Sequence, residues 1–309
     1  MIRASIDLGT NTCLLLVIDG DRVLHDESRV VRLGQDVAKA GRLHPEAMER
    51  TRHCLRDYAQ IASRLGVAAG SILAVATAQA RDAADAQPFF NDLEQQLGLR
   101  FRILSGQEEA RATFLGAAVA GSDPARIAVM DIGGGSTELV AHTGMRPIRE
   151  LQLEGESLPI GAVKITEKFL HSDPVTDAEF WAAEDAIDRE LLKMKPWREG
   201  IEMVGGPEFT AVAGTAVTLA MLQMGLTEFK ASDIDGFLIT RGDAHRLVEE
   251  LKWRTVEERK AMPGMEPKRA DVILAGALIF WRAMEVLDFP VARISTRGLR
   301  YGVFSLENP

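Results

Sequence analysis

The chain has 309 residues, of which 46% are hydrophobic and 26% are charged. This apolar fraction is typical of globular proteins, and the length suggests two domains of ordinary size. The balance of 36 Lys and Arg against 45 Asp and Glu residues gives a net charge of −9. So acidic a chain is not expected to coat nucleic acid or an anionic membrane through a general basic field.

Cysteine usage and hydropathy exclude further classes of protein. Two cysteines, Cys13 and Cys54, are too few for a disulfide framework, and no Cys/His cluster has zinc-ligand spacing. The longest strongly apolar run, 272–281, is far shorter than a bilayer span. The N-terminus, M-I-R-A-S-I-D, has no apolar segment typical of a secretion signal. We therefore expect a soluble, cytoplasmic protein with no nucleic-acid or membrane partner.

The first part of the chain predicts alternating strands and helices. Apolar runs at 2–6 and 14–18 predict two strands that flank a turn at 7–12. A helix is predicted over 45–65, where apolar residues recur every three to four positions between a first-turn proline and a following glycine. Strands are predicted at 72–76 and 101–104, with a helix between them that ends at Leu97. Ser105 and Glu108 have capping-box spacing and begin a helix that reaches about Val119.

The second part of the chain continues the alternation. The segment 120–124, A-G-S-D-P, predicts a domain boundary, which we place after residue 122. Strands at 127–130 and 139–140 enclose a glycine-rich turn. Helices are predicted at 176–194, at 216–224 and after Pro267, followed by a strand at 291–294 and a short terminal helix. The pattern predicts an α/β fold with domains at 1–122 and 123–309, the last helix being a candidate to pack on the first domain.

Two similar turns form an internal repeat, one small-domain length apart. D-L-G-T-N-T begins at Asp7 and D-I-G-G-G-S begins at Asp131, each after an apolar strand and before another. Successive backbone N–H groups in such a turn can form a concave anion site. The carboxylate at the head of each turn can hold Mg²⁺ or its waters, which bridge to phosphate oxygens. Hydroxyl donors are available from Thr10, Thr12, Ser136 and Thr137.

Each turn taken alone has a simpler interpretation. A single D-x-G-T is ordinarily only a hairpin turn, and three glycines can form a flexible loop. The recurrence of the same pattern favours a clamp in which two hairpins face across a cleft and hold a phosphate chain. Neither a P-loop nor a dinucleotide-binding fingerprint is present, so those two ways of binding phosphate are not supported.

Seven motifs follow one another along the chain: I-D-L-G-T-N-T-C-L-L-L-V, A-T-A-Q-A-R-D-A, S-G-Q-E-E-A-R, D-I-G-G-G-S-T-E-L-V, L-P-I-G-A-V-K-I-T-E, V-A-G-T-A-V-T-L-A and G-L-R-Y-G. Together they span essentially the whole chain and resemble the exopolyphosphatase/guanosine pentaphosphate phosphohydrolase family. The resemblance implies two ribonuclease-H-like domains, as in actin, sugar kinases and heat-shock ATPases, with an active-site cleft between them. It is closest to the short two-domain form, because longer relatives carry an extra C-terminal helical domain.

Hydrolysis of a phosphoanhydride needs an oriented water and neutralisation of the phosphate charge. The resemblance implies that Glu109 activates this water, with Asp131 and Glu138 as further catalytic acids. The alternative for Glu108 and Glu109 is helix capping, and we assign that role to Glu108. Asp7, Asp131 and Glu138 are the candidate Mg²⁺ ligands, and a monovalent cation is a second candidate cofactor. Their simpler interpretations are a turn-forming residue for Asp7 and a solvated strand position for Glu138.

The candidate phosphate-binding residues lie in the two turns or in matching motifs. They are Thr10, Asn11, Thr12, Arg81, Gly133, Gly134, Gly135, Ser136, Thr137, Gly214 and Thr215. The forked guanidinium of Arg81 suits a polyanion, although an exposed helix arginine is usually only solvated. Gly214 and Thr215 match positions where kinases of this superfold contact adenosine, and close strand–helix packing accounts equally well for Gly214. Lys268, Arg269, Arg297 and Arg300 are candidates to line the path of a longer chain, but scattered basic residues are usually plain surface, and we leave them out of the site. Cys13 is expected to be a buried small hydrophobe.

The leading hypothesis is a Mg²⁺-dependent exopolyphosphatase that removes terminal phosphate from inorganic polyphosphate, from guanosine pentaphosphate, or from both. One alternative is an ATP-dependent kinase on the same superfold, which the S-G-Q-E-E-A segment disfavours. Another is a non-catalytic sensor that binds polyphosphate or a guanosine alarmone, which Glu109, Asp131 and Glu138 disfavour. The family also implies a homodimer.

Overall fold

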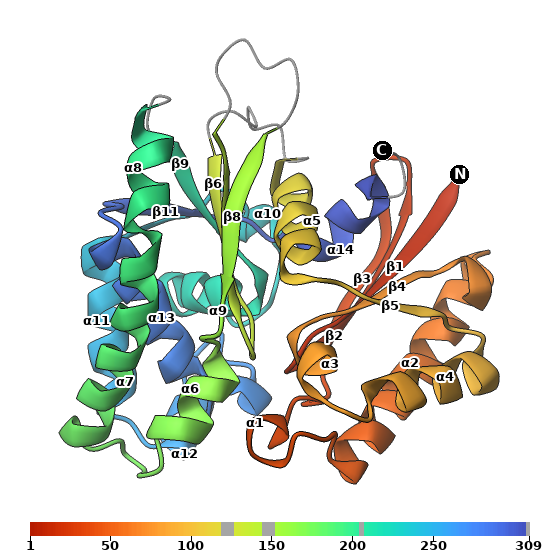
Figure 1. Ribbon diagram of the computed structural model, residues 1–309, viewed down its shortest axis with the longest axis horizontal. Coiled ribbons are helices and arrows are strands. Elements are labelled where there is room, and N and C mark those ends of the chain that lie inside the picture. The colour runs from red at the N-terminus through yellow and green to blue at the C-terminus, as the bar shows by residue number, and fades with distance from the viewer. Residues whose placement is uncertain (119–126, 144–151, 204–206, 307–309) are drawn as a thin grey trace. The chain divides into compact units, whose positions relative to one another are not determined.

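The computed structural model describes residues 1–118, 127–143, 152–203 and 207–306 (Figure 1). The chain forms two compact units, Met1–Gly116 together with Leu299–Pro309, and Ala117–Gly298. The predicted boundary after residue 122 lies outside the described residues. In the described part of the chain, no helix is long and apolar enough to cross a membrane.

The first unit is built on a sheet of strand order β3-β2-β1-β4-β5. Antiparallel pairing joins β1 (Ile2–Leu8), β2 (Thr12–Asp19) and β3 (Arg22–Val30), and β4 (Leu73–Ala76) and β5 (Phe101–Ile103) extend the sheet in parallel with β1. Its helical segments are α1 (Val37–Ala40), α2 (Pro45–Arg64), η1 (Ala69–Ser71), α3 (Ala78–Asp82), α4 (Ala86–Leu97), α5 (Gly106–Ala118), α14 (Leu299–Gly302) and η5 (Val303–Ser305).

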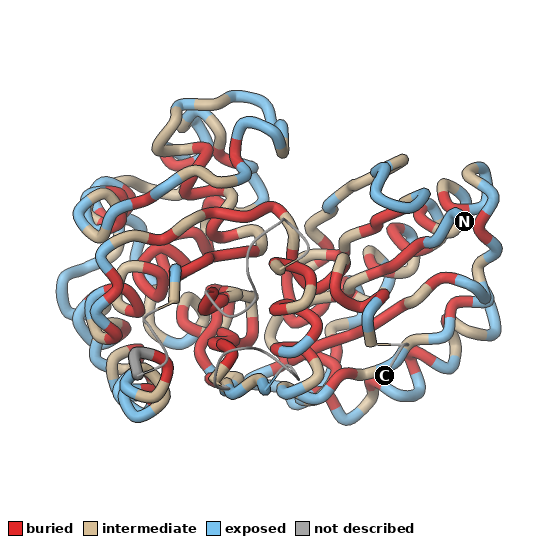
Figure 2. The backbone as a smooth tube through the Cα atoms, turned by 90° about the horizontal axis from the view of Figure 1, so that it is seen from above, coloured by how far each residue is buried: buried red, intermediate tan, exposed pale blue. Residues whose placement is uncertain are grey.

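Alternating side chains of this sheet enter two separate cores. On one face, buried residues of β1 and β2 pack with α2 and α4, which contribute Leu55, Tyr58 and Phe89. On the other face, Val75 of β4 packs with residues from α5, α14 and η5. Figure 2 shows that buried positions follow the strands and the inward faces of the helices. The C-terminal segment is therefore part of the first unit's core.

The second unit is built on a sheet of strand order β10-β11-β9-β6-β7-β8. Antiparallel pairing joins β6 (Ile127–Ile132), β7 (Thr137–His142) and β8 (Leu153–Leu158), and β9 (Glu208–Val212) and β11 (Val291–Ile294) follow in parallel with β6, with β10 (Leu238–Thr240) at the edge. Its helical segments are α6 (Ala162–Phe169), α7 (Asp177–Leu191), η3 (Leu192–Met194), α8 (Lys195–Met203), α9 (Ala213–Met224), α10 (Ala231–Ile234), α11 (Arg241–Lys252), α12 (Val256–Lys260), η4 (Pro267–Arg269) and α13 (Ile273–Val286).

The two sheets repeat one topology. β3-β2-β1-β4-β5 in the first unit corresponds to β8-β7-β6-β9-β11 in the second, with the same parallel and antiparallel neighbours. The predicted α/β class is therefore confirmed, and so is the internal repeat. The predicted helices at 45–65 and 176–194 match α2 and the α7–η3 run, and the predicted strand at 291–294 is β11. The edge strands β3 and β8, which pair with β2 and β7, were not predicted from the sequence.

Candidate active site

The two predicted turns close equivalent hairpins, one in each unit. In the β1–β2 hairpin the backbone N–H of Gly9 donates to the carbonyl of Thr12 at 2.8 Å. In the β6–β7 hairpin the N–H of Gly133 donates to the carbonyl of Ser136 at 3.0 Å. The flanking residues pair in the same register, Leu8 with Cys13 and Ile132 with Thr137. The similarity of the two turns thus extends to their hydrogen bonding.

The carbonyl oxygens of the second turn are bound by the N-terminus of α6. Gly133 accepts from the N–H of Ala162 at 2.9 Å, and Gly134 accepts from Val163 at 2.9 Å and Lys164 at 3.1 Å. The first N–H groups of a helix have no partner within the helix, and here the turn supplies one. Among the described residues, the N–H groups of Gly134 and Gly135 donate to no acceptor. They are therefore available to an anion.

The segment after β3 binds the first turn in the same way. The carbonyl of Thr10 accepts from the N–H of Gly34 at 2.9 Å, and that of Asn11 accepts from Val31 at 3.0 Å and Arg32 at 2.9 Å. A Cβ at Gly34 would lie 2.2 Å from the Thr10 methyl carbon, so this close approach requires glycine. Each unit thus ties the turn carbonyls to the segment that follows its third strand.

Gln79 of α3 supports the first turn, although it was not a predicted site residue. Its amide nitrogen donates to the carbonyl of Leu8 at 2.7 Å, and its amide oxygen accepts from the Thr10 hydroxyl at 3.2 Å. Gln79 is buried, and the polar residue inside A-T-A-Q-A-R was the available signal. The buried side-chain oxygen of Asn11 has no hydrogen-bond partner among the residues that the structure describes. The Thr10 hydroxyl, by contrast, already donates to Gln79.

Glu109 and Arg81 meet at the start of α5. Glu109 is 7% exposed, and its carboxylate accepts from the Arg81 guanidinium at 2.7 Å. The same guanidinium nitrogen also donates to the carbonyl of Leu104 at 2.8 Å, which fixes the direction of the side chain. Arg81 is therefore a half-buried residue that is ion-paired with Glu109, and it is not a solvated helix residue.

The neighbouring Glu108 has the capping role predicted for it. Its carboxylate accepts from the backbone N–H of Ser105 at 2.8 Å, and the Ser105 hydroxyl accepts from the N–H of Glu108 at 3.2 Å. Arg102 forms an ion pair with the same carboxylate. Two consecutive glutamates thus have different surroundings, since Glu108 caps the helix at the surface and Glu109 lies in the interior.

Asp7 lies near the end of β1, where the charge of Glu109 acts on it. Burial and the Glu109 carboxylate raise the pKa of Asp7 to about 7, while the Arg300 guanidinium acts in the opposite direction. Arg300 is buried and forms two hydrogen bonds of 2.9 Å with the carboxylate of Asp26. Arg300 is therefore not the surface residue that the sequence suggested. The carboxyl of Asp7 is poised between its neutral and charged forms at neutral pH.

In the second unit, Asp131 and Glu138 lie directly opposite one another on β6 and β7. Glu138 also pairs in register with Ser157 of β8, whose hydroxyl donates to its carboxylate at 2.7 Å. Like charges at directly opposed positions destabilise a sheet unless another group balances them. Glu138 is 1% exposed, so it is not the solvated strand position considered as its alternative.

This donor set fits Mg²⁺. The ion is usually bound by one or two carboxylates together with waters and substrate phosphates. Asp131 and Glu138 supply two carboxylates beside a turn with available N–H groups. No group of three or more His, Cys, Asp or Glu side chains able to hold a metal occurs within the described ranges. Waters and phosphate oxygens would complete the coordination.

The remaining candidates support the second turn. The hydroxyl of Thr137 donates to the carbonyl of Ile160 at 2.7 Å, and that of Thr215 to the carbonyl of Ile132 at 3.2 Å. Both hydroxyls are thus used to position backbone. A Cβ at Gly214 would lie 2.0 Å from a terminal nitrogen of Arg269, so this guanidinium packs directly on the start of α9. Arg269, which we had treated as a surface residue, is thereby placed beside two candidates.

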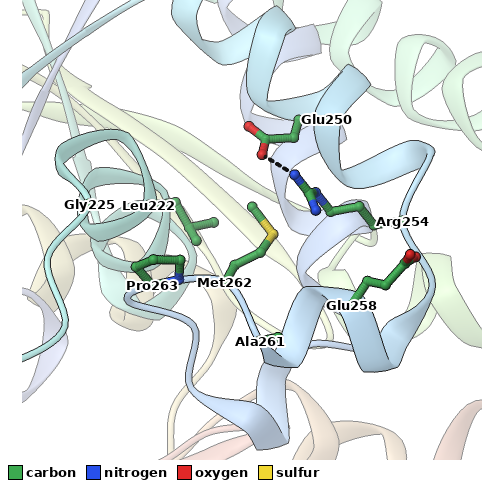
Figure 3. A pocket seen from close by; sticks show the side chains of 8 residues that line it. All are labelled: Leu222, Gly225, Glu250, Arg254, Glu258, Ala261, Met262 and Pro263. Carbon is green, nitrogen blue, oxygen red and sulfur yellow. Dashed lines mark hydrogen bonds and ion pairs between the residues drawn. The ribbon is translucent and has the colours of Figure 1, made fainter.

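The candidates fall into two sets, one at the turn of each unit. The first unit holds Asp7, Thr10, Asn11, Thr12, Arg81 and Glu109, and the second holds Asp131, Gly133, Gly134, Gly135, Ser136, Thr137, Glu138, Gly214 and Thr215. A cavity of about 250 Å³ elsewhere in the second unit contains none of them (Figure 3). It is lined by Leu222, Gly225, Glu250, Arg254, Glu258, Ala261, Met262 and Pro263. With two carboxylates and one guanidinium, this cavity is not suited to a polyanion.

Comparison with known proteins matches most of the chain. The model of the Ppx/GppA phosphatase family matches residues 18–308. Exopolyphosphatase 2 of Mycobacterium tuberculosis is 36% identical over 290 residues, which cover 89% of this chain and 88% of that protein.

Solved structures are similar over nearly the whole chain. The Ppx/GppA family member of Aquifex aeolicus has a TM-score of 0.79 at 30% identity and covers 99% of this chain and 97% of its own. An exopolyphosphatase from Cytophaga hutchinsonii has a TM-score of 0.85 at 25% identity, with coverage of 99% and 97%. These neighbours are two-domain proteins of the actin-like fold, which confirms the predicted fold class.

Proposed function

The chain belongs to the Ppx/GppA phosphatase family, and on this premise we propose that it is an exopolyphosphatase that releases the terminal phosphate of inorganic polyphosphate. The observation that carries the proposal is the Gly133–Ser136 turn. Its carbonyl oxygens are bound by the N-terminus of α6, and the N–H groups of Gly134 and Gly135 donate to no acceptor within the described part of the chain. A turn with this arrangement is a preorganised anion site. The 36% identity to an exopolyphosphatase supports polyphosphate as the anion.

Glu109 is the proposed base. A buried carboxylate held by one guanidinium and surrounded by protein can orient a water and accept its proton as the oxygen attacks phosphorus. Arg81 keeps the carboxylate in one direction through its 2.7 Å hydrogen bond, because its own position is fixed by the carbonyl of Leu104. The bond from phosphorus to the bridging oxygen then breaks, and the shortened chain leaves.

Charge on the phosphates must be balanced during this step. In the proposal, Asp131 and Glu138 of the second unit would hold Mg²⁺. When bound, Mg²⁺ would neutralise phosphate charge and help orient the phosphate that is attacked. The backbone N–H groups of Gly134 and Gly135 would bind phosphate oxygens as neutral donors.

Guanosine pentaphosphate is the second candidate substrate. The family model that matches this chain is named for both Ppx and GppA phosphatases, and both substrates end in a phosphoanhydride. Its hydrolysis would use the same turn and the same base.

Phosphate release with Mg²⁺ tests the proposal, with short polyphosphate, long polyphosphate, guanosine pentaphosphate and ATP compared in one assay. Fast release from polyphosphate is expected. Release from guanosine pentaphosphate alone would move the protein to alarmone hydrolysis, and consumption of ATP only with an added phosphoacceptor would identify a kinase. No release from any of the four, with binding retained, would favour the non-catalytic sensor.

Glu109→Gln tests the assignment of the base. The variant should lose at least about 10²-fold in kcat while still binding polyphosphate. Glu108→Gln is the matched control, because it changes the adjacent glutamate, which caps the helix at the surface. It should lower thermal stability slightly and leave kcat nearly unchanged. Equal effects of the two substitutions on kcat would contradict the assignment.

A further inference from the structure

A buried glutamine joins the first turn to the helix that carries Arg81. Gln79 lies on α3, two residues before Arg81, and is 2% exposed. Its amide nitrogen donates to the carbonyl of Leu8 at 2.7 Å, and its amide oxygen accepts from the Thr10 hydroxyl at 3.2 Å. A carbonyl oxygen can only accept, so the NH₂ group must face Leu8, and this fixes the orientation of the amide. Both polar ends of the side chain are therefore bound to the turn.

The first turn is also packed closely against this side chain. A Cβ at Gly34 would lie 2.2 Å from the Thr10 methyl carbon and 3.3 Å from the Cβ of Gln79. The turn is held through the carbonyl of Thr10, which accepts from Gly34, and through the hydroxyl of the same residue, which donates to Gln79. In the part of the chain that the structure describes, the backbone N–H groups of Thr10 and Asn11 donate to no acceptor. These N–H groups are available to an anion.

The second unit contains an equivalent contact. Ile132 ends β6 as Leu8 ends β1, and its carbonyl accepts from the hydroxyl of Thr215 at 3.2 Å. Thr215 lies at the start of α9, which follows β9, and Gln79 lies on α3, which follows the corresponding strand β4. Each unit thus uses a different buried polar residue to bind the same carbonyl. A contact that recurs in both units serves the feature that they share, which is the turn.

The same short helix also holds the proposed base. Arg81 donates to the carboxylate of Glu109 at 2.7 Å and to the carbonyl of Leu104 at 2.8 Å. Residues two apart on a helix point in different directions, so Gln79 and Arg81 reach different groups. The far ends of both side chains are hydrogen-bonded. The helix α3 therefore sets the position of the first turn relative to the Glu109 carboxylate.

We propose that Gln79 is a positioning residue for the reaction, which holds the first turn where a phosphate bound to its N–H groups meets the water activated by Glu109. This inference rests on the proposed function, in which Glu109 is the base. Gln79 contacts neither the phosphate nor the water, and it acts only through the turn. A displaced turn would still bind phosphate, but attack would be slower, because a misplacement of about 1 Å can cost about 100-fold in rate. Loss of Gln79 should therefore lower kcat more than it lowers affinity.

Gln79→Met tests the proposal, because it keeps the length of the side chain and removes both hydrogen bonds. Its kcat for polyphosphate should fall at least about tenfold. The Kd for short polyphosphate, measured in the Glu109→Gln background to prevent turnover, should change by less than about threefold, because the backbone donors remain. Weaker binding with an unchanged kcat would overturn the positioning role.

Thr51→Val is the matched control for loss of a buried hydrogen bond. The Thr51 hydroxyl is fully buried and donates to the carbonyl of Ala47 within α2 at 2.8 Å. The control should lower Tm and leave kcat within about twofold of the wild-type value, since it changes no residue of the turn or of α3. Equal losses of kcat in Thr51→Val and Gln79→Met would reduce the role of Gln79 to stability and overturn the proposal.

Thr10→Val shows whether Gln79 acts through the turn. Valine keeps the shape of threonine and removes the hydroxyl that donates to Gln79. In the Thr10→Val background, Gln79→Met should lower kcat by a smaller factor than it does in the wild type, because one of its two hydrogen bonds is already absent. Fully additive effects of the two substitutions would contradict action through the turn.

Hydrogen exchange provides a measurement that needs no turnover. The N–H groups of Gly9 and Gly34 donate to the carbonyls of Thr12 and Thr10. Both should exchange at least about tenfold faster in Gln79→Met than in the wild type, and the Thr51→Val control should show no such change. Unchanged exchange would overturn the proposal. If the wild type released no phosphate, the proposed function and the positioning role would both fail, whereas the exchange rates would still show whether Gln79 holds the turn.

Discussion

A Cβ atom at Gly161 would lie 2.5 Å from both the carbonyl carbon and the carbonyl oxygen of Gly134. Real side chains do not approach backbone this closely, so the residue before α6 must be glycine for the helix N-terminus to reach the turn. The phosphate-binding orientation proposed for Gly134 and Gly135 therefore depends on a residue that carries no functional group.

Replacing Gly161 should separate α6 from the turn. Gly161→Ala is expected to cost about 1–3 kcal/mol of unfolding free energy and to lower kcat/KM for polyphosphate at least about tenfold. Thermal unfolding and phosphate release measure the two effects. Gly200→Ala is the control, because a Cβ there meets nothing within 4 Å. Retained activity in Gly161→Ala would show that the turn tolerates a different support.

Arg81 should be needed for its geometry as well as its charge. Arg81→Lys keeps a cation but cannot hold both Glu109 and the carbonyl of Leu104 with the same planar group, so kcat should fall about 10- to 100-fold. The control is Arg102→Lys, which changes the exposed ion-pair partner of Glu108. Its rate should stay within about twofold of the wild-type rate. Steady-state kinetics on polyphosphate compare the two. Equal rates for both variants would remove Arg81 from the site.

Glu138 should set the requirement for Mg²⁺. Glu138→Gln removes one of two opposed carboxylates, so the Mg²⁺ concentration for half-maximal rate should rise about tenfold or more. The control is Glu156→Gln, since Glu156 is exposed and precedes Ser157 on β8, which places it on the other side of the strand. Titration of Mg²⁺ at fixed substrate provides the measurement. An unchanged Mg²⁺ dependence of Glu138→Gln would contradict its role as a ligand.

Asp7 should make the ligand-free protein less stable as the pH rises. Its pKa is raised to about 7 in the folded state from an ordinary value of 3.8, so the folded protein retains a proton that the unfolded chain releases. Stability is then lost between about pH 4 and pH 7. Asp7→Asn removes this loss, and its Tm should exceed that of the wild type by about 4 °C or more near neutral pH, with little difference near pH 4.

Both proteins should be measured in the presence of a metal chelator, because a bound cation would favour the charged form of the Asp7 carboxyl. Thermal unfolding of both proteins at several pH values gives the difference directly. A Tm difference that stays constant across the series would mean that Asp7 affects stability through packing and not through its proton.

The sequence predicted the interior of the fold better than its edges. β1, β6 and β11 are short apolar runs between turn residues, and these patterns identified them. β3 and β8 read R-V-L-H-D-E-S-R-V and L-E-G-E-S-L, whose polar composition is typical of loops. Each lies at one edge of its sheet and buries little of either face, so burial did not leave a hydrophobic pattern in its sequence.

The candidate site divides in the same way. The repeated turns were visible because glycine and small polar residues recur at matching positions. Gln79 and Gly34 were not predicted as site residues, and Arg269 was interpreted as a surface residue, because their roles depend on contacts with residues far away in the chain. A buried glutamine or arginine cannot be distinguished from a surface one by its letter, whereas a repeated glycine turn can.

The grouping of Leu299–Pro309 with Met1–Gly116 has a consequence for synthesis of the chain. Leu299 and Val303 complete the core on one face of the first sheet, and a Cβ at Gly302 would lie 1.7 Å from the carbonyl oxygen of Ala112. When the first 116 residues have emerged from the ribosome, this part of their core has therefore not yet been synthesised. The residues of the second unit are synthesised without interruption, although they come later in the sequence, whereas the core of the first unit is complete only after Leu299 and Val303 have been added.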